Sequence, residues 1–227
     1  EAIDAVLRDN LHGLEIDERC CQIAAFALAF EAWKLTGYRP LPELHIACTG
    51  IGPQSTQEQW VKLAEQSGIP MPTVGREAIK NGLLNLHRLF SQAPTLGSLI
   101  NPAELPVDLI AADYETIQPY LTAIRAVEKA DDETRERAIA AAGMVKAADL
   151  LAGDYTLVIT NVPYLGRGKQ DDTLKAHLEK HYKTGKADLA TAFVLRCLEF
   201  CAKDGSTALV TPQNWLFLTT YTKLRQR

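Results

Sequence analysis

The sequence predicts an α/β fold in which a mostly parallel sheet is interrupted by a long helical insertion. Three observations lead to this prediction. Residues 11–50 follow the order strand, helix, strand, residues 155–212 repeat that order, and residues 51–153 between them carry only helical patterns. Strands that alternate with helices build open parallel sheets with helices on both faces. We therefore expect a first sheet-forming part at 1–50, the helical insertion, and a second sheet-forming part at 154–227.

The first part begins with a short predicted helix at 1–9 and a predicted strand at 11–17. Asp17 is a favoured N-cap residue, and the helix that follows it ends at Gly37, a natural C-terminal stop. A second strand is predicted at 43–50. The apolar side chains of the helix recur at the spacing of one helix face, and they are Ile23, Phe26, Ala27, Phe30 and Trp33.

The insertion contains four helical patterns separated by prolines. We predict helices near 55–67, 76–92, 113–129 and 131–151, with turns at 70–72, 94–102 and 106. The last helix carries Glu and Arg residues together, which is typical of a solvated face.

The second part resumes the strand–helix order. Residues 155–160, with the sequence YTLVIT, are apolar on both faces, as in a central parallel strand. A polar, lysine-rich loop is predicted at 165–186, followed by a helix at 187–205 that ends at Gly205 and a strand at 206–212. We leave open whether the loop becomes ordered on DNA or stays solvated. Its basic residues are Lys175, His177, Lys180, His181 and Lys183.

The composition is that of an ordinary globular protein. The 227 residues are 47% hydrophobic and 23% charged, with a formal net charge of -4. A strongly basic nucleic-acid-binding protein would have a different balance, although a local basic surface is enough for contact with nucleic acid. No signal peptide and no apolar run of about 18 residues is present, so no membrane association is expected.

The cysteines indicate a reducing compartment. Their number is odd, and neither the adjacent Cys20 and Cys21 nor the pair Cys197 and Cys201 has the spacing of a zinc site. We therefore expect five reduced and mostly buried thiols, Cys48 included, in a cytoplasmic protein without metal ligands.

Two acidic residues lie at the end of the first strand, where ligands of open α/β sheets bind. They are Glu15 and Asp17. A carboxylate in that place can accept two hydrogen bonds from the hydroxyl groups of a ribose, which indicates a nucleoside-containing cofactor. The alternative is that the acid only caps the following helix. We assign the cap to Asp17 and the ribose contact to Glu15.

A second polar cluster, Asn161-Val162-Pro163-Tyr164, follows the strand at 155–160. Pro163 keeps Val162 out of the helical conformation, so the Oδ1 atom of Asn161 and the carbonyl oxygen of Val162 can converge on one amino group. Two acceptors that bind both N–H groups of an aromatic amine keep its lone pair available for an electrophile. Tyr164 can lie against the face of the same heterocycle. The alternative is a structural turn after the strand.

The stretch TNVPY at 160–164 resembles the Asn-Pro-Pro-Tyr motif of amino-group methyltransferases that use S-adenosylmethionine. Three longer stretches resemble the same family in the same order, and they are LHGLEIDERCCQIAAFAL, DYTLVITNVPYLG and DLATAFVLRCLEFCAKDGSTALVTPQNWLF. The resemblance covers about residues 1–50 and 150–227 and points to large bacterial adenine-specific DNA methyltransferases of restriction-modification and phage-exclusion systems. It implies a Rossmann-like methyltransferase fold, incomplete in this chain, with 51–153 as a helical insertion.

The same resemblance implies a role for each residue of the site. Asn161 and the Val162 carbonyl would orient the N6 amine of adenine, and Tyr164 would stack on the base after it flips out of the duplex. Glu15 would hold the cofactor ribose, with Ile16 against the cofactor adenine. Orientation and proximity can suffice for the methyl transfer, and no general base is evident. Double-stranded DNA would be the partner of the full-length protein, together with other restriction or defence subunits.

The sequence departs from the family pattern in three ways. Val162 replaces a proline, which leaves the carbonyl group in place. An acid after the strand at 43–50 is not evident, because Cys48 and Thr49 stand there; Asp149 is an alternative, and this ligand is left open. The glycine-rich loop that contacts the amino-acid end of the cofactor would precede residue 1. We therefore expect an excised piece of a longer protein that is inactive by itself.

Two other functions stay open at this point. The same motif serves methyltransferases that act on RNA bases or on protein glutamine, because both substrates present a planar amine. A catalytically silent binding or assembly module would keep the fold without the chemistry. Trp215, which follows the last strand, either forms a wall of the base pocket or packs in the interior.

Overall fold

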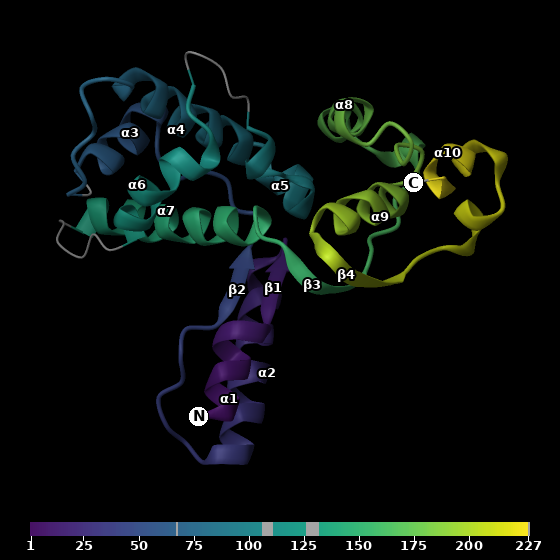
Figure 1. Cartoon of the computed structure of the whole chain (residues 1–227), viewed down its shortest axis with the longest axis horizontal. Helices are drawn as coiled ribbons and strands as arrows, with labels where there is room; N and C mark the ends of the chain where they lie inside the picture. The colour runs from purple at the N-terminus through teal and green to yellow at the C-terminus, as the bar shows by residue number, and fades with distance from the viewer. Residues whose placement is uncertain (67, 106–110, 126–131, 227) are drawn as a thin grey trace. The chain divides into compact units, whose positions relative to one another are not determined.

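The computed structural model describes residues 1–66, 68–105, 111–125 and 132–226. These residues form two compact units, Glu1–Ala152 and Gly153–Arg227, and each unit contains one two-stranded parallel sheet (Figure 1). The chain is therefore a mixed α/β protein with parallel strand pairs, as the alternation of strands and helices predicts. The division into parts at 1–50, 51–153 and 154–227 stays a prediction.

The sheet of the first unit pairs β1 (His12–Glu15) with β2 (His45–Cys48) in parallel, so the two strands end side by side. α2 (Glu18–Thr36) connects them along the chain. α1 (Ala2–Ala5) and a π-helical turn (Val6–Asn10) precede β1. The strand–helix–strand order predicted for this part is confirmed.

Both ends of α2 are fixed by the residues that the sequence indicates. The Asp17 carboxylate accepts a hydrogen bond from the backbone N–H of Arg19 at 2.9 Å, as an N-cap does. Gly37 adopts a positive φ of 74°, and its N–H donates to the Trp33 carbonyl at 2.8 Å. β1 therefore passes into α2 through one short turn, and the two residues predicted to bind the cofactor are the last residue of β1, Glu15, and the first residue of this turn, Ile16.

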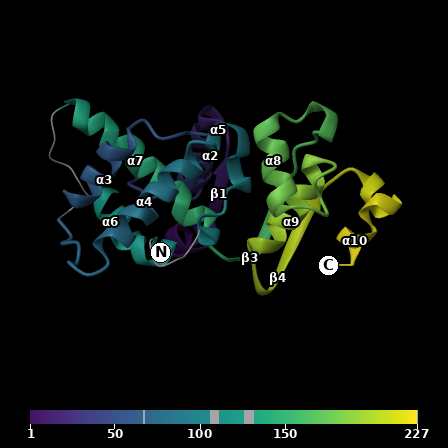
Figure 2. The same cartoon turned by 90° about the horizontal axis from the view of Figure 1, so that it is seen from above.

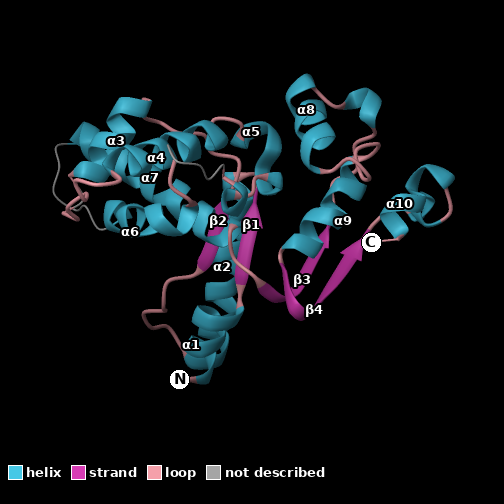
Figure 3. Ribbon diagram, turned by 45° about the horizontal axis from the view of Figure 1, so that its top comes forward, coloured by secondary structure: helices cyan, strands magenta, loops and turns pink. Residues whose placement is uncertain are grey.

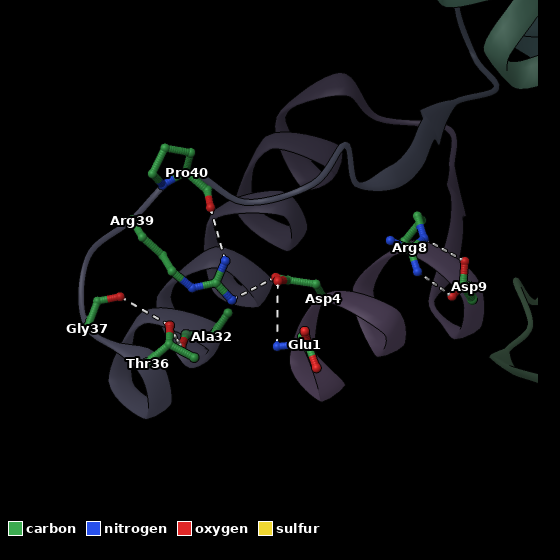
Figure 4. Close-up of polar contacts among 9 residues, drawn as sticks. All are labelled: Glu1, Asp4, Arg8, Asp9, Ala32, Thr36, Gly37, Arg39 and Pro40. Atoms are coloured by element: carbon green, nitrogen blue, oxygen red, sulfur yellow. Dashed lines mark hydrogen bonds and ion pairs between the residues drawn. The ribbon is translucent and has the colours of Figure 1, made fainter.

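An ion pair ties α1 to the connection between α2 and β2 (Figure 4). Asp4 lies 2.7 Å from the guanidinium group of Arg39, which also donates to the Pro40 carbonyl at 3.2 Å. The hydrogen bond from Arg39 lowers the pKa of the Asp4 carboxyl. The indole N–H of Trp33 donates to the Arg39 carbonyl at 2.8 Å. These contacts close the connection at the opposite end of α2 from the turn after β1.

A helical region follows β2 in the same unit (Figure 2). Its longer helices are α3 (Gln57–Glu65), α4 (Arg76–Phe90), α6 (Tyr114–Arg125) and α7 (Asp132–Leu151). Between α4 and α6 lie the short helical turns α5 (Ala93–Leu96), Gly97–Leu99 and Pro102–Glu104. The four helices predicted for the insertion are confirmed over the described residues. The predicted turn at 106 and the predicted helix ends within 126–131 lie outside the described residues.

The helical region has a closed apolar core. The Trp60 side chain is fully buried, and its indole N–H donates to the Leu83 carbonyl at 3.0 Å. Thr56 and Gln59 form a capping box that starts α3 and so positions the tryptophan one turn later. Other fully buried side chains of this core are Leu86, Phe90, Ile100, Ile117, Leu121 and Val145.

α7 joins this core to the sheet of the same unit, because it packs against both β1 and β2. The ammonium group of Lys146 donates to the Leu44 carbonyl at 2.6 Å, directly before β2, and lies 3.0 Å from the Glu43 carboxylate. The sheet is thus held by α7 as well as by α2.

The second unit pairs β3 (Tyr155–Asn161) with β4 (Cys201–Val210) in parallel, and Figure 3 shows the two strands side by side. α8 (Asp172–His181) and α9 (Leu189–Glu199) lie between the strands along the chain. The strand predicted from YTLVIT is confirmed. Short turns complete the unit, and they are Arg167–Lys169, Gln213–Leu216, Thr219–Tyr221 and α10 (Thr222–Arg225).

The helix predicted at 187–205 is wrong in its last part. α9 ends at Glu199, and β4 begins at Cys201 because the backbone there pairs with β3. Residues 202–205 then leave the regular register of the strand pair before the ladder resumes. A Cβ at Gly205 would lie 3.0 Å from each of two backbone carbonyl oxygens, so a glycine is needed where the strand returns to its partner.

The polar loop predicted at 165–186 is also wrong, because it contains the helix α8. The Asp171 carboxylate accepts a hydrogen bond from the Leu174 N–H at 2.8 Å and caps the helix. Leu174 and Leu178, four positions apart, are both buried and form a narrow apolar face. Two leucines are too few to give a clear helical periodicity, so the many polar and lysine residues around them favoured the prediction of a loop.

Two apolar faces are exposed in the described structure. On α2, the Phe26 side chain is 64% exposed, and Ile23 and Phe30 are also exposed. On β3, Leu157 and Ile159 are exposed, and β4 is the only strand that pairs with β3 among the described residues. The prediction of a central strand buried on both faces is therefore not met in the described structure.

The prediction that the cysteines are mostly buried is wrong for four of the five. Cys197 is buried in α9, and this burial raises the pKa of its thiol to about 11. Cys20 is exposed, because it lies on the solvent side of the first turn of α2. Cys21, Cys48 and Cys201 are half-buried, and all five thiols are free.

Candidate active site

The residues predicted to hold an amine lie where β3 and β4 end. Asn161 is the last residue of β3 and is in register with Val210, the last residue of β4. The backbone N–H of Val162 donates to the Val210 carbonyl at 3.3 Å, and the Val162 side chain is buried. The loop therefore leaves the sheet with its first two residues fixed by the strand pair.

The hydroxyl group of Tyr164 points back to the end of the sheet. It donates to Oδ1 of Asn161 at 3.2 Å and lies 3.5 Å from the Val210 carbonyl oxygen. The Tyr164 side chain is 55% exposed, and Asn161 is exposed as well. The amide is thus bound by the tyrosine and not by its own backbone, and the ring stays open to solvent.

Two hydrogen-bond acceptors are available at this end of β3. Oδ1 of Asn161 has a second lone pair beyond the one that Tyr164 uses. The Val162 carbonyl oxygen accepts no hydrogen bond from any residue that the structure describes. Pro163, which follows, is exposed and has no N–H to donate. An amide oxygen and a peptide oxygen of consecutive residues can therefore receive the two N–H groups of an amine.

The far side of the loop is held by residues 165–167, which pair with residues 187–189; we call this pairing the clasp. It consists of two 3.0 Å hydrogen bonds, from Leu189 N–H to Leu165 O and from Arg167 N–H to Ala187 O, and an antiparallel bridge between Gly166 and Asp188. The buried side chain of Gln170 donates a further hydrogen bond to the Leu165 carbonyl at 3.1 Å. The segment after Tyr164 is therefore anchored to the start of α9.

Glu15 ends β1, and the turn that follows holds its carboxylate. Oε1 accepts hydrogen bonds from the N–H of Ile16 at 2.7 Å and the N–H of Asp17 at 3.1 Å. The Glu15 carbonyl accepts from the Thr49 N–H at 2.7 Å. Oε2 accepts no hydrogen bond from the part of the chain that the structure describes. The acid is thus fixed in direction with one oxygen atom available.

Ile16 lies beside the end of β2. A Cβ atom at Gly50 would be 2.1 Å from the Ile16 carbonyl oxygen, so any larger residue there would collide with the backbone. The Ile16 side chain lies against Gly97, where a Cβ would be 2.9 Å from its Cδ1 atom. Ile16 is nevertheless 47% exposed. The turn after β1 therefore presents an apolar side chain next to a fixed carboxylate.

Cys48 and Thr49, which stand where the acid after the second strand is missing, and the alternative ligand Asp149 are all engaged by protein groups. Thr49 is fully buried, and its hydroxyl lies 3.3 Å from the Glu15 carbonyl oxygen. The Cys48 thiol donates to a carbonyl of the turn after β1 at 3.4 Å. Asp149 on α7 accepts a hydrogen bond from the Tyr114 hydroxyl at 2.6 Å. The acidic ligand at this position stays open.

The basic residues predicted to lie in a loop are on α8 or directly after it. His177 and His181 stack with their ring centroids 4.6 Å apart, and Lys180 and Lys183 are exposed. Among the residues that the structure describes, no group of three or more His, Cys, Asp or Glu could hold a metal ion, and no helix has the length and apolar character to cross a membrane.

Trp215 lies in the turn after β4, half-buried. Its indole N–H donates to the Thr211 hydroxyl at 3.0 Å. The guanidinium group of Arg225 donates to the Trp215 carbonyl at 2.7 Å and to the Leu218 carbonyl at 2.9 Å, so this turn has a fixed shape. Whether Trp215 forms a wall of the base pocket or only packs in the interior stays open.

The predicted site residues form two groups, each within one unit. Glu15 and Ile16 belong to the first unit, and Asn161 to Tyr164 belong to the second. Sequence reasoning missed Gly50, for which the available signal was a glycine at the end of the strand predicted at 43–50. It also missed Val210, which contributes a carbonyl group and therefore leaves no side-chain signal.

A family model described as Eco57I restriction-modification methylase matches residues 9–227. Adenine-specific methyltransferase BrxX of Escherichia coli O9:H4 (strain HS) is 28% identical over 236 residues, which cover 97% of this chain and 19% of that protein. Adenine-specific methyltransferase PglX of Lacticaseibacillus casei (strain Zhang) is 26% identical over 232 residues, which cover 100% of this chain and 18% of that protein. The chain thus spans about a fifth of the length of these curated relatives. The resemblance seen in the motifs is confirmed, and the chain belongs to the Eco57I restriction-modification methylase family.

Proposed function

We propose that this chain carries the adenine-binding loop and part of the cofactor site of a DNA adenine N6-methyltransferase that uses S-adenosylmethionine. One observation carries the proposal: at the end of β3 the Asn161 amide oxygen accepts a hydrogen bond from the exposed Tyr164, and the carbonyl oxygen of the next residue, Val162, accepts none from the described residues. The family membership and the two adenine-specific relatives support the choice of adenine in DNA.

The two acceptors would fix the N6 amine of the adenine. Each accepts one N–H, and the amine lone pair is then free to point at an electrophile. The backbone of Val162 is bonded to β4 and its side chain is buried, so the carbonyl group has little freedom to turn away. These residues contribute orientation and proximity, which are sufficient for large rate increases.

Tyr164 would stack on the adenine after the base leaves the duplex, because an exposed aromatic ring can bind the face of any base. Before the base enters, the tyrosine hydroxyl holds the Asn161 amide in place. A carbonyl oxygen has two lone pairs, so Oδ1 can keep this bond while it accepts the amine. The loop is therefore arranged in advance for the base.

Glu15 and Ile16 fit the nucleoside end of the cofactor. The available Oε2 atom of Glu15 would accept hydrogen bonds from ribose hydroxyls, and the half-exposed Ile16 would lie against the cofactor adenine. When bound, S-adenosylmethionine supplies a methyl group on a positively charged sulfur, which is the electrophile for the amine. The Ile16 and Asp17 amides would keep the carboxylate directed at the ribose.

The proposal includes the fold and the biological context. We infer a Rossmann-like, mostly parallel sheet built from residues 1–50 and 154–227, with 51–153 as a helical insertion; the parallel strand pairs and the family support this. Double-stranded DNA would be the substrate of the whole protein, in a cytoplasmic restriction-modification or phage-defence system that includes other subunits.

Methylation mapping of host DNA tests this proposal. Genomic DNA from cells with and without the full gene that encodes this chain is sequenced for N6-methyladenine. We expect N6-methyladenine at one recurring sequence only when the gene is present. Asn161→Ala should remove it, whereas Asn85→Ala, which deletes an amide on α4, should not. Unchanged N6-methyladenine would overturn the proposal, and new methylation of RNA bases or protein glutamine would assign the site to those substrates instead.

Calorimetry with S-adenosylmethionine separates an enzyme from a silent binding module. We expect binding by the protein that carries this chain, and weaker binding after Glu15→Gln, which removes the negative charge and replaces one acceptor oxygen by an NH2 donor. Glu18→Gln, an exposed acid in the first turn of α2, is the matched control and should bind normally. Absence of binding by the unaltered protein would favour the silent module.

A further inference from the structure

Two thiols lie on either side of Glu15, the residue proposed to hold the ribose. Cys48 ends β2 and is in register with Glu15 across the sheet, and Cys21 lies in the first turn of α2. The Sγ atom of Cys21 is 3.9 Å from the Glu15 carbonyl oxygen, and the Sγ atom of Cys48 is 3.4 Å from the Ile16 carbonyl oxygen. Because these carbonyls belong to consecutive residues, both sulfur atoms lie over the same turn.

The two thiols also interact with each other. Burial raises the pKa of the Cys21 thiol to about 12, and the nearby Cys48 side chain contributes to the same rise. Cys20 precedes Cys21 in the sequence but is exposed, so it serves as an internal control for a thiol outside the pair. The close pair is thus Cys21 and Cys48.

We propose that Cys21 and Cys48 form a covalent modification site, in which a disulfide bond joins α2 to the end of β2 when a small disulfide such as oxidised glutathione is present. Both thiols are half-buried and therefore reachable by such a reagent. The geometry carries this proposal independently of the methyltransferase chemistry.

The reaction is two successive thiol–disulfide exchanges. The Cys48 thiolate attacks one sulfur of the oxidant, an S–S bond forms to Cys48, and the other half of the oxidant leaves and is protonated to a thiol. Cys21 loses its proton and attacks the Cys48 sulfur, and the second half leaves as a thiol. The protein gives up two electrons and two protons, and the oxidant becomes two thiol molecules. Cys21 acts second because its raised pKa makes it the poorer nucleophile at neutral pH.

The disulfide would displace the turn after β1. A disulfide sulfur carries no proton, so both hydrogen bonds from the thiols to the Glu15 and Ile16 carbonyls are lost, and the two sulfur atoms are drawn to about 2.05 Å from each other. The N–H groups of Ile16 and Asp17, which belong to this turn, hold the Glu15 carboxylate. Oxidation would therefore move the carboxylate away from its present direction.

Cofactor affinity is the functional readout, and this consequence rests on the proposed function. We expect the oxidised protein to bind S-adenosylmethionine about tenfold more weakly than the reduced protein, since a misplaced hydrogen bond to a charged group has about that effect. Addition of a thiol reductant should restore the affinity. The formation of the disulfide itself does not depend on the cofactor.

Peptide mapping of the 227-residue chain tests the modification site. The chain is incubated with oxidised glutathione, the remaining thiols are alkylated, and the tryptic peptides are sequenced by mass spectrometry. We expect a cross-link between the peptide that begins at Cys20 and the peptide that contains Cys48. Fragment ions should place the bond on Cys21 and the alkyl group on Cys20. No cross-link, or a bond on Cys20, would overturn the proposal.

Serine variants provide the matched comparison. Cys20→Ser should leave the cross-link intact, whereas Cys21→Ser and Cys48→Ser should each abolish it. Circular dichroism checks that every variant folds. If a variant does not fold, the fragment ions of the unaltered chain still identify which cysteines are joined. A cross-link with unchanged cofactor affinity would overturn the effect on the cofactor. If neither the oxidised nor the reduced protein binds S-adenosylmethionine, the proposed function fails while the disulfide site stands.

Discussion

The helical region from α3 to α7 and the helix α2 belong to the same unit, but they bury their apolar side chains to very different extents. Trp60 and Leu83 in the helical region are fully buried. On α2, Ile23, Phe26 and Phe30 face solvent, and the rings of the two phenylalanines stack on each other with centroids 5.9 Å apart. The same kinds of residue therefore form a closed core in one region and an open surface in the other.

This difference indicates where the stability of the unit comes from. Burial of apolar area is the dominant favourable term in folding, and the helical region supplies most of it. α2 packs on β1 and β2 and leaves its apolar face open; the Asp17 cap fixes its start, and the Asp4–Arg39 ion pair lies just beyond its C-terminus. A contiguous apolar face on a folded protein marks a surface for further contacts.

The largest difference in stability between the two regions is expected when one aromatic ring is removed from each. Trp60→Ala should lower the free energy of unfolding by about 3–5 kcal/mol, because it opens a cavity and removes the hydrogen bond to Leu83. Phe26→Ala should cost less than about 1 kcal/mol, because the ring is already exposed. Urea unfolding of both variants measures the difference. Equal losses would mean that α2 is buried in solution.

A smaller effect is expected at the junction of the two regions. Gly50→Ala places a methyl group 2.1 Å from the Ile16 carbonyl, and overpacking of this kind costs about 1–3 kcal/mol or more. Gly52→Ala is the control, because its Cβ would meet ordinary neighbours at 3.6 Å or beyond. Thermal unfolding should give a lower Tm for Gly50→Ala than for Gly52→Ala. A stable Gly50→Ala protein would show that the ends of β1 and β2 can move apart.

Acid should affect the sheet more than the helical core. Burial, and then the charge of His45, lowers the pKa of His12 below its ordinary value of 6.5; the two rings stack with centroids 5.1 Å apart. The unfolded chain therefore binds the proton more readily, so stability is full above about pH 6.5 and falls as the pH drops toward the folded pKa. Unfolding measured against pH should show a shallower fall in His12→Gln. An identical slope in both proteins would contradict this.

The smallest expected change in stability is on the open face of α2. Replacing Phe26 and Phe30 by serine should leave the free energy of unfolding within about 1 kcal/mol of the unaltered value. Light scattering should nevertheless report weaker self-association, because the exposed apolar patch is removed. Unaltered self-association would mean that other exposed surfaces dominate it.

Elements with strong local signals could be predicted from the sequence, whereas those that depend on distant pairing could not. Asp17 and Gly37 mark both ends of α2, and the periodic apolar residues located the helices of the insertion. The course of the chain after Glu199 depends on the pairing of Cys201 with Tyr155, which no local pattern reveals. The helical spacing around Cys201 therefore predicted the wrong element.

The candidate site was predictable in its residues but not in its contacts. The order of Asn161 and Tyr164 in one short motif assigned both to the site. The bond between them depends on how β3 and β4 are aligned, since the tyrosine hydroxyl also faces the Val210 carbonyl. The exposure of α2 was unpredictable for another reason: the spacing of Ile23 and Phe26 shows that one face is apolar, but not which partner covers it.

The clasp between residues 165–167 and 187–189 has a consequence for engineering. Its two strands pair through their own backbone, so the segment that they enclose, 168–186, begins and ends at fixed positions. A fluorescent reporter attached at Lys183, an exposed residue directly after α8, would keep the buried Leu174 and Leu178 and the Arg167–Glu179 ion pair in place, which makes this position suitable for a sensor of base binding.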